Sequence, residues 1–245
     1  MLLNRHAQER SARERELAQL AQLYASNGVA LSAAAVPEDA RLSAVDPERD
    51  LAAEAAFAEA LLGRCGSEEM GGGIYRYTGE AGQCLLRSSG MVEAALDRAV
   101  DDPEQFADRL CESFGYRLES SELTALSGTV RAVRVVSENV VFNAGLDLVF
   151  SDGRLVSVAG FFLPAAEAAA AAEKSMGAVT ALVRFLDYSN SSGEVCTAIT
   201  GVDSGYLLQN TAPAAVRLLP AWRISTDVNQ YYVNMATGEV TREST

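Results

Sequence analysis

Histidine, tryptophan and long apolar runs are scarce in this sequence, and each shortage excludes a class of function. The 245 residues contain one histidine, His6, and one tryptophan, Trp222. A Ser-His-Asp triad or a Cys-His pair would need His6 to be carried from the chain terminus into a pocket, and an HExxH zinc site is impossible. No apolar run reaches the roughly 18 residues of a membrane-spanning helix, and no signal peptide is recognisable.

An excess of basic residues is also missing. The chain has 33 acidic and 20 basic residues, a net charge of −13. Binding of nucleic acid normally needs a basic surface that displaces counterions, and an acidic chain is repelled by anionic lipid. We therefore expect no nucleic-acid partner. The charge fits solubility or the attraction of a basic partner.

The cysteines and glycines form no metal or phosphate motif. Cys65, Cys84, Cys111 and Cys196 include no CxxC pair, and their separations of 19, 27 and 85 residues match no zinc ribbon or finger. Gly71-Gly72-Gly73 is not followed by the Lys-Ser/Thr pair of a phosphate-binding loop. We expect no metal and no cofactor. The cysteines are either free buried thiols or form one or two disulfides in an oxidising compartment.

Paired carboxylates leave one enzymatic alternative, because two Asp or Glu residues can hydrolyse glycosides without histidine. Glu68-Glu69 and Asp101-Asp102 are such pairs. Side chains of adjacent residues usually diverge, however, and the second pair precedes Pro103 as a helix cap would. We assign no catalytic residue, and we expect the protein not to be an enzyme.

Helical signals recur along the chain. The clearest lies after Ser175, where Val179, Leu182, Val183 and Leu186 follow the spacing of an amphipathic helix. Further helices are predicted over residues 9–27, from Asp46-Pro47-Glu48 onward, and from Asp101 or Asp102 to Gly115. The alanine-rich run 164–174 predicts a helix or a connector.

Strand signals fill most of the remaining chain. Residues 74–88 predict a hairpin, whereas residues 64–73 are glycine-rich and predict a loop, and residues 91–100 are compatible with strand or helix. Alternating segments follow between 128 and 163. The Asp152-Gly153 dipeptide between them is typical of a type I′ hairpin turn. A second group of strands is expected between 195 and 241.

This order predicts an α+β fold in which helices pack on antiparallel β-sheet. Residues 103–163 and 175–242 each run from a helix through strands to a hairpin, which indicates a duplicated module. One continuous sheet that carries both helices is the alternative. The domains are then an N-terminal helical segment, 1–66, a first α+β module, 67–163, and a second, 164–245.

An aromatic cluster supplies the candidate binding residues. Trp222, Arg223, Tyr231 and Tyr232 lie within residues 217–235, our first choice of contact surface. Tyrosine and tryptophan suit interfaces because they combine a large apolar body with a polar group. Adjacent strand residues point to opposite faces, so we expect one of the two tyrosines to be exposed. Packing of Trp222 and one tyrosine in the core is the alternative.

At these residues the sequence resembles a known family. LLPAWRISTDVNQYYVNMATGEV, residues 218–240, resembles the ending of YycH/YycI-type regulatory proteins, which accompany a bacterial two-component system. It is also similar to PepSY-like modules, related to the cystatin-like arrangement of a helix on a small antiparallel sheet. Residues 179–209 fit the helix and strands that precede this ending. The resemblance covers about 128–242.

The resemblance implies a non-enzymatic, extracytoplasmic regulatory or interaction module that is anchored in the membrane and contacts a protein partner. That partner would be a membrane sensor kinase or a related regulator. The chain itself lacks the anchor helix. Its start, MLLNRHAQERSARERE, is compatible with the remainder of an anchor that has been removed. The alternatives are a small-ligand binding domain with a cavity between helix and sheet, and the two-carboxylate hydrolase.

Overall fold

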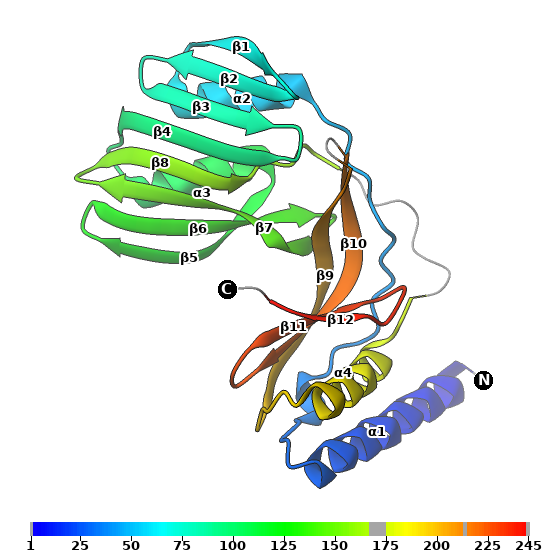
Figure 1. The fold of residues 1–245 in the computed structure, drawn as a ribbon. Helices are drawn as coiled ribbons and strands as arrows, with labels where there is room; N and C mark the ends of the chain where they lie inside the picture. The colour runs from blue at the N-terminus through cyan, green and yellow to red at the C-terminus, as the bar shows by residue number, and fades with distance from the viewer. Residues whose placement is uncertain (1, 167–174, 213–214, 244–245) are drawn as a thin grey trace. The chain divides into compact units, whose positions relative to one another are not determined.

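The computed structural model describes residues 2–166, 175–212 and 215–243. It confirms an α+β fold in which helices pack on antiparallel β-sheet (Figure 1). The chain divides into two compact units. Unit 1 consists of Met1–Ser43, Ala170–Gly205 and Pro220–Thr245, and unit 2 of Ala44–Ala169 and Tyr206–Leu219.

This division differs from the predicted domains. The predicted N-terminal segment, 1–66, is shared between the units, because its first 43 residues belong to unit 1 and the rest to unit 2. Each unit has a separate core that joins segments far apart in the chain. Local patterns cannot reveal such long-range pairing, since a helix shows where its apolar face lies but not what covers it.

Residues 51–161 of unit 2 form two similar halves, each a helix followed by four strands. The first half is α2 (Leu51–Leu62), β1 (Cys65–Gly71), β2 (Ile74–Gly79), β3 (Gly82–Arg87) and β4 (Met91–Ala99). The second is α3 (Pro103–Phe114), β5 (Tyr116–Thr124), β6 (Ser127–Val136), β7 (Asn139–Ser151) and β8 (Arg154–Phe161). These strands are antiparallel in the order β1-β2-β3-β4-β8-β7-β6-β5, so the last strands of the two halves pair at the centre.

The ends of the two helices follow from capping. The predicted cap of α3 is confirmed, since the Asp102 carboxylate accepts from Gln105 N at 3.0 Å and Gly115 ends the helix in the left-handed conformation. The predicted start of α2 at Asp46 is wrong. Asp50 caps this helix instead, by accepting from the amides of the second and third helical residues.

The hairpin and strand predictions had mixed outcomes. Asp152 (φ 49°) and Gly153 (φ 73°) both adopt positive φ, as a type I′ turn between β7 and β8 requires. Residues 65–71, predicted as a loop, form the edge strand β1. The undecided residues 91–99 form β4, in which buried and exposed residues alternate.

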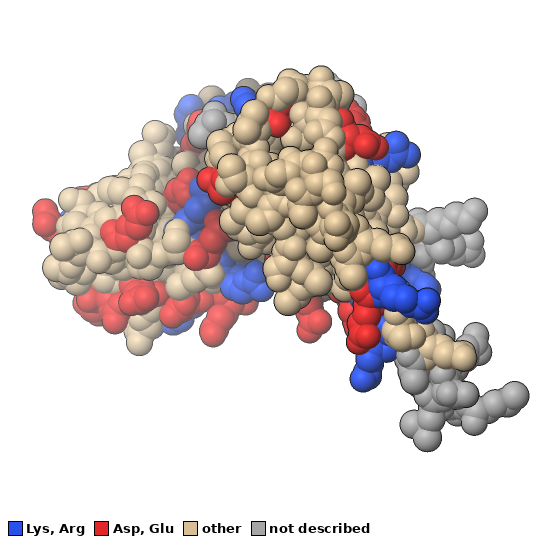
Figure 2. Space-filling view, turned by 90° about the horizontal axis from the view of Figure 1, so that it is seen from below, with Lys and Arg blue, Asp and Glu red and all other residues tan. Residues whose placement is uncertain are grey.

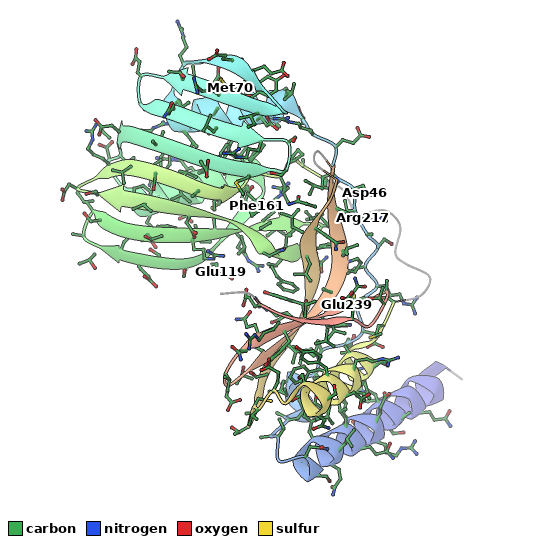
Figure 3. All side chains as sticks on the ribbon, in the orientation of Figure 1. Asp46, Met70, Glu119, Phe161, Arg217 and Glu239 are labelled. Atoms are coloured by element: carbon green, nitrogen blue, oxygen red, sulfur yellow. The ribbon has the colours of Figure 1, made fainter. Side chains whose placement is uncertain are left out.

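The core of unit 2 lies between the helices and one face of the sheet. In Figure 1, α2 and α3 lie behind the strands. Phe57 of α2 stacks on Phe162 with ring centroids 4.5 Å apart, and Phe114 of α3 meets Phe57 edge-on at 5.2 Å. Among the residues that the structure describes in unit 2, no helix lies over the opposite face of the sheet, and Phe161 lies on that side (Figure 3).

Unit 1 contains α1 (Leu2–Ser26), the short η1 (Ala33–Ala35) and α4 (Ala178–Ser192). Its strands come from β9 (Ile199–Ala212), β10 (Ala215–Thr226), β11 (Gln230–Asn234) and β12 (Val240–Arg242), of which β9 and β10 run through both units. A helix followed by four strands therefore occurs three times. The predicted order of a helix followed by strands is present within 103–163 and 175–242, and a third copy at 51–99 was not foreseen. The described strands belong to one twelve-stranded sheet, as the alternative held.

Two long-range hydrogen bonds fix the helices of unit 1. The Tyr24 hydroxyl of α1 donates to the Leu182 carbonyl of α4 at 2.8 Å. Asp39 accepts from Ala178 N at 2.9 Å, and so caps α4 from a distant segment, whereas the predicted cap Ser175 lies before the helix. Of the alanine-rich run, residues 164–166 have no regular structure and 167–174 lie outside the described residues.

Candidate functional site

The predicted aromatic cluster lies mainly in the core of unit 1. Trp222 is fully buried, and its indole Nε1 donates to the Met176 carbonyl at 2.7 Å. Tyr231 is 1% exposed and Tyr232 is 5% exposed. The expectation that one tyrosine would be exposed is therefore wrong, and Trp222 and Tyr231 form part of the packed core as the alternative held.

Each tyrosine is buried on a different face of β11. Tyr231 packs against Phe185 and Tyr188 of α4, with centroid distances of 4.8 and 6.1 Å. Its hydroxyl donates to the Glu194 carboxylate at 2.9 Å, and burial, followed by this contact, raises the pKa of Tyr231. The Tyr232 hydroxyl donates to Glu243 at 2.8 Å. Chain segments cover both faces of the strand, a feature that alternation in the sequence does not predict.

Arg223 is the one partly accessible member of the predicted set. Its guanidinium pairs with Asp203 of β9 at 2.9 Å, and its side chain is 24% exposed. Asp203 lies within β9. Binding by Trp222, Arg223, Tyr231 and Tyr232 stays a prediction, but three of the four present almost no surface to a partner.

The cysteines are four free thiols. Cys65 lies on β1 and Cys84 on β3, with β2 between them. Two strand spacings amount to about 9.6 Å, and a disulfide needs Cα atoms closer than about 7 Å. Burial raises the pKa of Cys84 to about 12 and that of Cys111 to about 11, so both thiols are unreactive at neutral pH.

The carboxylate pairs do not face each other. Glu68 and Glu69 are successive residues of edge strand β1 and therefore point to opposite faces. Asp102 is occupied as the cap of α3. Within residues 2–166, 175–212 and 215–243, no group of three or more His, Cys, Asp or Glu residues is arranged to hold a metal ion. His6 lies in α1, and its side chain is not among those described.

A shallow, open apolar groove of about 730 Å³ runs along one flank of α1 in unit 1. One wall is α1 itself, and the other is the extended segment after it together with the start of β9. Ala30 holds this second wall, since its amide donates to Thr197 O (2.8 Å) and its carbonyl accepts from Ile199 N (2.9 Å). The principal lining residues are Ala18, Ala21 and Ala25 on α1, and Val29, Ala198 and Ile199 opposite.

The loops beside this groove expose further apolar side chains. Val195 is 76% exposed and Val228 is 62% exposed, values that are high for valine. Their loops are tied together by the Asp227 carboxylate, which accepts from Thr197 Oγ1 at 2.6 Å and from the Thr197 and Ala198 amides. These hydrogen bonds, chiefly the one from the Thr197 hydroxyl, lower the pKa of Asp227.

Few charges lie on this part of unit 1. The view from below in Figure 2 shows a broad area without Lys, Arg, Asp or Glu, bordered by charged groups. The tan surface also includes uncharged polar side chains, so only the lining of the groove counts as an apolar patch, a kind of surface that often marks an interaction site. Helical spacing alone does not reveal the groove. Ala21, which lines it, follows the same spacing as Leu17, Leu20 and Tyr24, which face the core.

A small, partly open cavity in unit 2 bears on the small-ligand alternative. It has a volume of about 30 Å³ and is bordered by Arg49, Arg87 and Phe162. A buried water needs roughly 10–15 Å³ of such volume, so this cavity holds about two waters. A drug-sized ligand does not fit there. Of the two arginines, Arg49 already has a carboxylate partner, since its Nε lies 2.6 Å from Glu54 Oε1.

Comparison with known proteins leaves the family open. No protein-family model and no curated protein matches the sequence. Among solved structures, the chain is similar to an uncharacterized protein from Eubacterium rectale, with 10% identity, a TM-score of 0.48 and coverage of 83% of this chain and 81% of that one. This distant similarity assigns no function. Within the described residues, no helix has both the length and the apolarity to cross a membrane.

Proposed function

We propose that this chain is a non-enzymatic interaction module that acts by protein–protein contact, as an extracytoplasmic regulator of a bacterial two-component system. The observation that carries the contact role is the apolar groove on unit 1, whose roughly 730 Å³ lie open beside α1. Residues 218–240, through their resemblance to YycH/YycI-type proteins, supply the signalling part of the proposal.

The groove suits a helix of the partner. Its α1 wall carries alanines at i, i+3 and i+7, which form a shallow surface on one flank of the helix. Small side chains let two helix axes approach to about 8 Å. Apolar grooves of this kind accept amphipathic helices, whose anchors recur at helical spacing. The exposed valines at Val195 and Val228 would extend the apolar contact.

Charge indicates which helix would bind. The chain carries −13, so the field around it attracts basic partners and accelerates their association at low salt. The partner that fits is therefore an amphipathic helix with small apolar anchors and basic flanks, in a sensor kinase or a related envelope regulator. Its binding should weaken as salt is added, because salt screens exposed charges beyond about 8–10 Å.

A matched pair of variants on α1 tests this proposal. Ala25 lines the groove, whereas Ala12 is exposed elsewhere on the same helix. A photoreactive residue in place of Ala25 should crosslink an envelope signalling protein in intact cells, and one in place of Ala12 should not. With the captured protein purified, Ala25→Arg should weaken binding about tenfold or more, because the new charge must be desolvated in an apolar contact.

A control variant on the same helix separates an effect of the groove from a general effect of added charge. Ala12→Arg adds the same charge outside the groove and should change the affinity by less than about twofold. If Ala25 yields no adduct with an envelope protein, or if the two arginine variants bind equally well, the groove is not the contact surface.

A further inference from the structure

The two halves of unit 2 differ at the outer faces of their helices. On α3 the exposed residues are all polar: Glu104, Gln105, Asp108, Arg109, Glu112 and Ser113. On α2 the exposed residues are Leu51, Ala52, Ala56 and Glu59. The two halves share the same order of elements, so α2 and α3 are equivalent helices. The polar outer face of α3 is the composition expected for a helix face that contacts water.

The outer face of α2 is composed like a buried face. Leu51 is 43% exposed, and Ala52 and Ala56 are exposed, with Glu59 the one charge among them. Ala55 and Ala60 are half-buried and pack against the core of unit 2. A helix that is apolar all round is normally covered on both sides. The sheet covers only the side that carries Phe57 and Leu61.

The charges at the two ends of α2 are opposite in sign. Glu48 and the cap Asp50 lie at its N-terminal end, and Arg64 follows directly after its C-terminal cap Gly63. Glu48, Asp50 and Arg64 are all exposed. An antiparallel pair of such helices would place Arg64 of each copy beside Glu48 and Asp50 of the other, whereas a parallel pair would bring the acidic ends together.

We propose that the outer face of α2 binds the same face of a second copy of this chain, with the two helices antiparallel about a twofold axis. The face is self-complementary, as a twofold contact requires. Alanines at the centre allow close approach, opposite charges meet at both ends, and the antiparallel helix dipoles attract. This association is independent of the groove on unit 1 and of the partner proposed for it.

The contact is small. The α2 helix has 12 residues, a length of about 18 Å. One face of that length buries less than the roughly 800 Å² per partner of a stable standard interface, so we expect a dissociation constant in the range of about 1–100 μM. Sedimentation of the full chain between about 1 and 500 μM covers this range.

Two sets of variants test the arrangement. Ala56→Arg should raise the dissociation constant at least about tenfold, because two arginines would meet at the twofold axis. Ser113→Arg places the same charge on the outer face of α3 and should leave the constant within about twofold of the wild type. Circular dichroism establishes that both variants retain the wild-type fold, which is expected because both sites are exposed.

A charge exchange tests the direction of the helices. Arg64→Glu should weaken the dimer by about fivefold or more, since it repels Glu48 and Asp50 of the other copy. The double variant Glu48→Arg with Arg64→Glu should recover part of the lost affinity, because the new arginine attracts the new glutamate while Asp50 still repels it. A chain that stays monomeric at 500 μM (about the highest concentration tested), a dimer insensitive to Ala56→Arg, or a double variant as weak as Arg64→Glu would each overturn the proposal.

Discussion

Removal of the Glu54 carboxylate should destabilise unit 2 more than any surface change. Glu54 is 5% exposed, and both of its oxygens accept from Arg49, at 2.6 and 2.9 Å. This contact raises the pKa of the Arg49 guanidinium, which also donates to Gly73 O at 2.8 Å and lies over the Tyr75 ring. Glu54→Leu would leave a largely buried cation with no carboxylate partner.

The magnitude follows from burial. Loss of one member of a buried pair typically costs about 3–5 kcal/mol. The Arg49 side chain is 23% exposed, so water can solvate it in part and the lower figure of about 3 kcal/mol applies. At a urea m-value of about 2 kcal/mol per molar, the midpoint of unfolding should fall by about 1.5 M.

The assay is urea unfolding followed by far-UV circular dichroism. Trp222 fluorescence is recorded in parallel as a report on unit 1, to which this residue belongs. The double variant Arg49→Met with Glu54→Leu removes both charges and should lie within about 1 kcal/mol of the wild type. If the double variant is as unstable as Glu54→Leu, the loss comes from packing, and the reasoning from charge is refuted.

Two further predictions concern titration and backbone strain. Burial holds the pKa of the Cys84 thiol at about 12 and that of the Cys111 thiol at about 11, against 9.0 for a free thiol. Between pH 9 and 11 these thiols therefore ionise only in the unfolded chain, so the free energy of unfolding should fall as the pH rises through that window. Cys84→Ala should flatten this fall in unfolding curves, and an unchanged slope would contradict the prediction. Gly160→Ala should cost more than about 3 kcal/mol, because a Cβ at φ +134° would lie 2.1 Å from Gly145 O. Gly193→Ala, at φ +75° in open space, is the control and should cost about 1–2 kcal/mol in the same unfolding assay, and equal losses would contradict the steric account.

Much of the local structure could be predicted from sequence. The cap at Asp102, the type I′ turn at Asp152-Gly153 and the amphipathic helix after residue 175 each depend on interactions within a few residues. The α+β class followed from the order of these elements. Where a second interaction competed, prediction failed: Asp39 rather than Ser175 caps α4, because a distant segment supplies the carboxylate.

The candidate surfaces were harder to predict. Periodicity identified apolar residues but not which of them would be covered. Tyr232 became buried because Glu243 and neighbouring segments lie over the second face of β11. Ala25 stayed exposed although the adjacent Tyr24 on the same helix is fully buried. The apolar outer face of α2 is unusual only in comparison with the polar outer face of α3. The two helices are recognised as equivalent only from the tertiary structure, in which β4 pairs with β8.

The sequence by itself determined the composition of each helix and strand, the turns and caps that bound them, and the scarcity of proton-transferring side chains. Those features are local or compositional, so neighbouring residues suffice to specify them. Tertiary structure decided which segments share a core, which aromatic residues are buried, and which apolar surfaces remain open. These depend on contacts between residues as far apart as Tyr24 and Leu182, which no local pattern encodes.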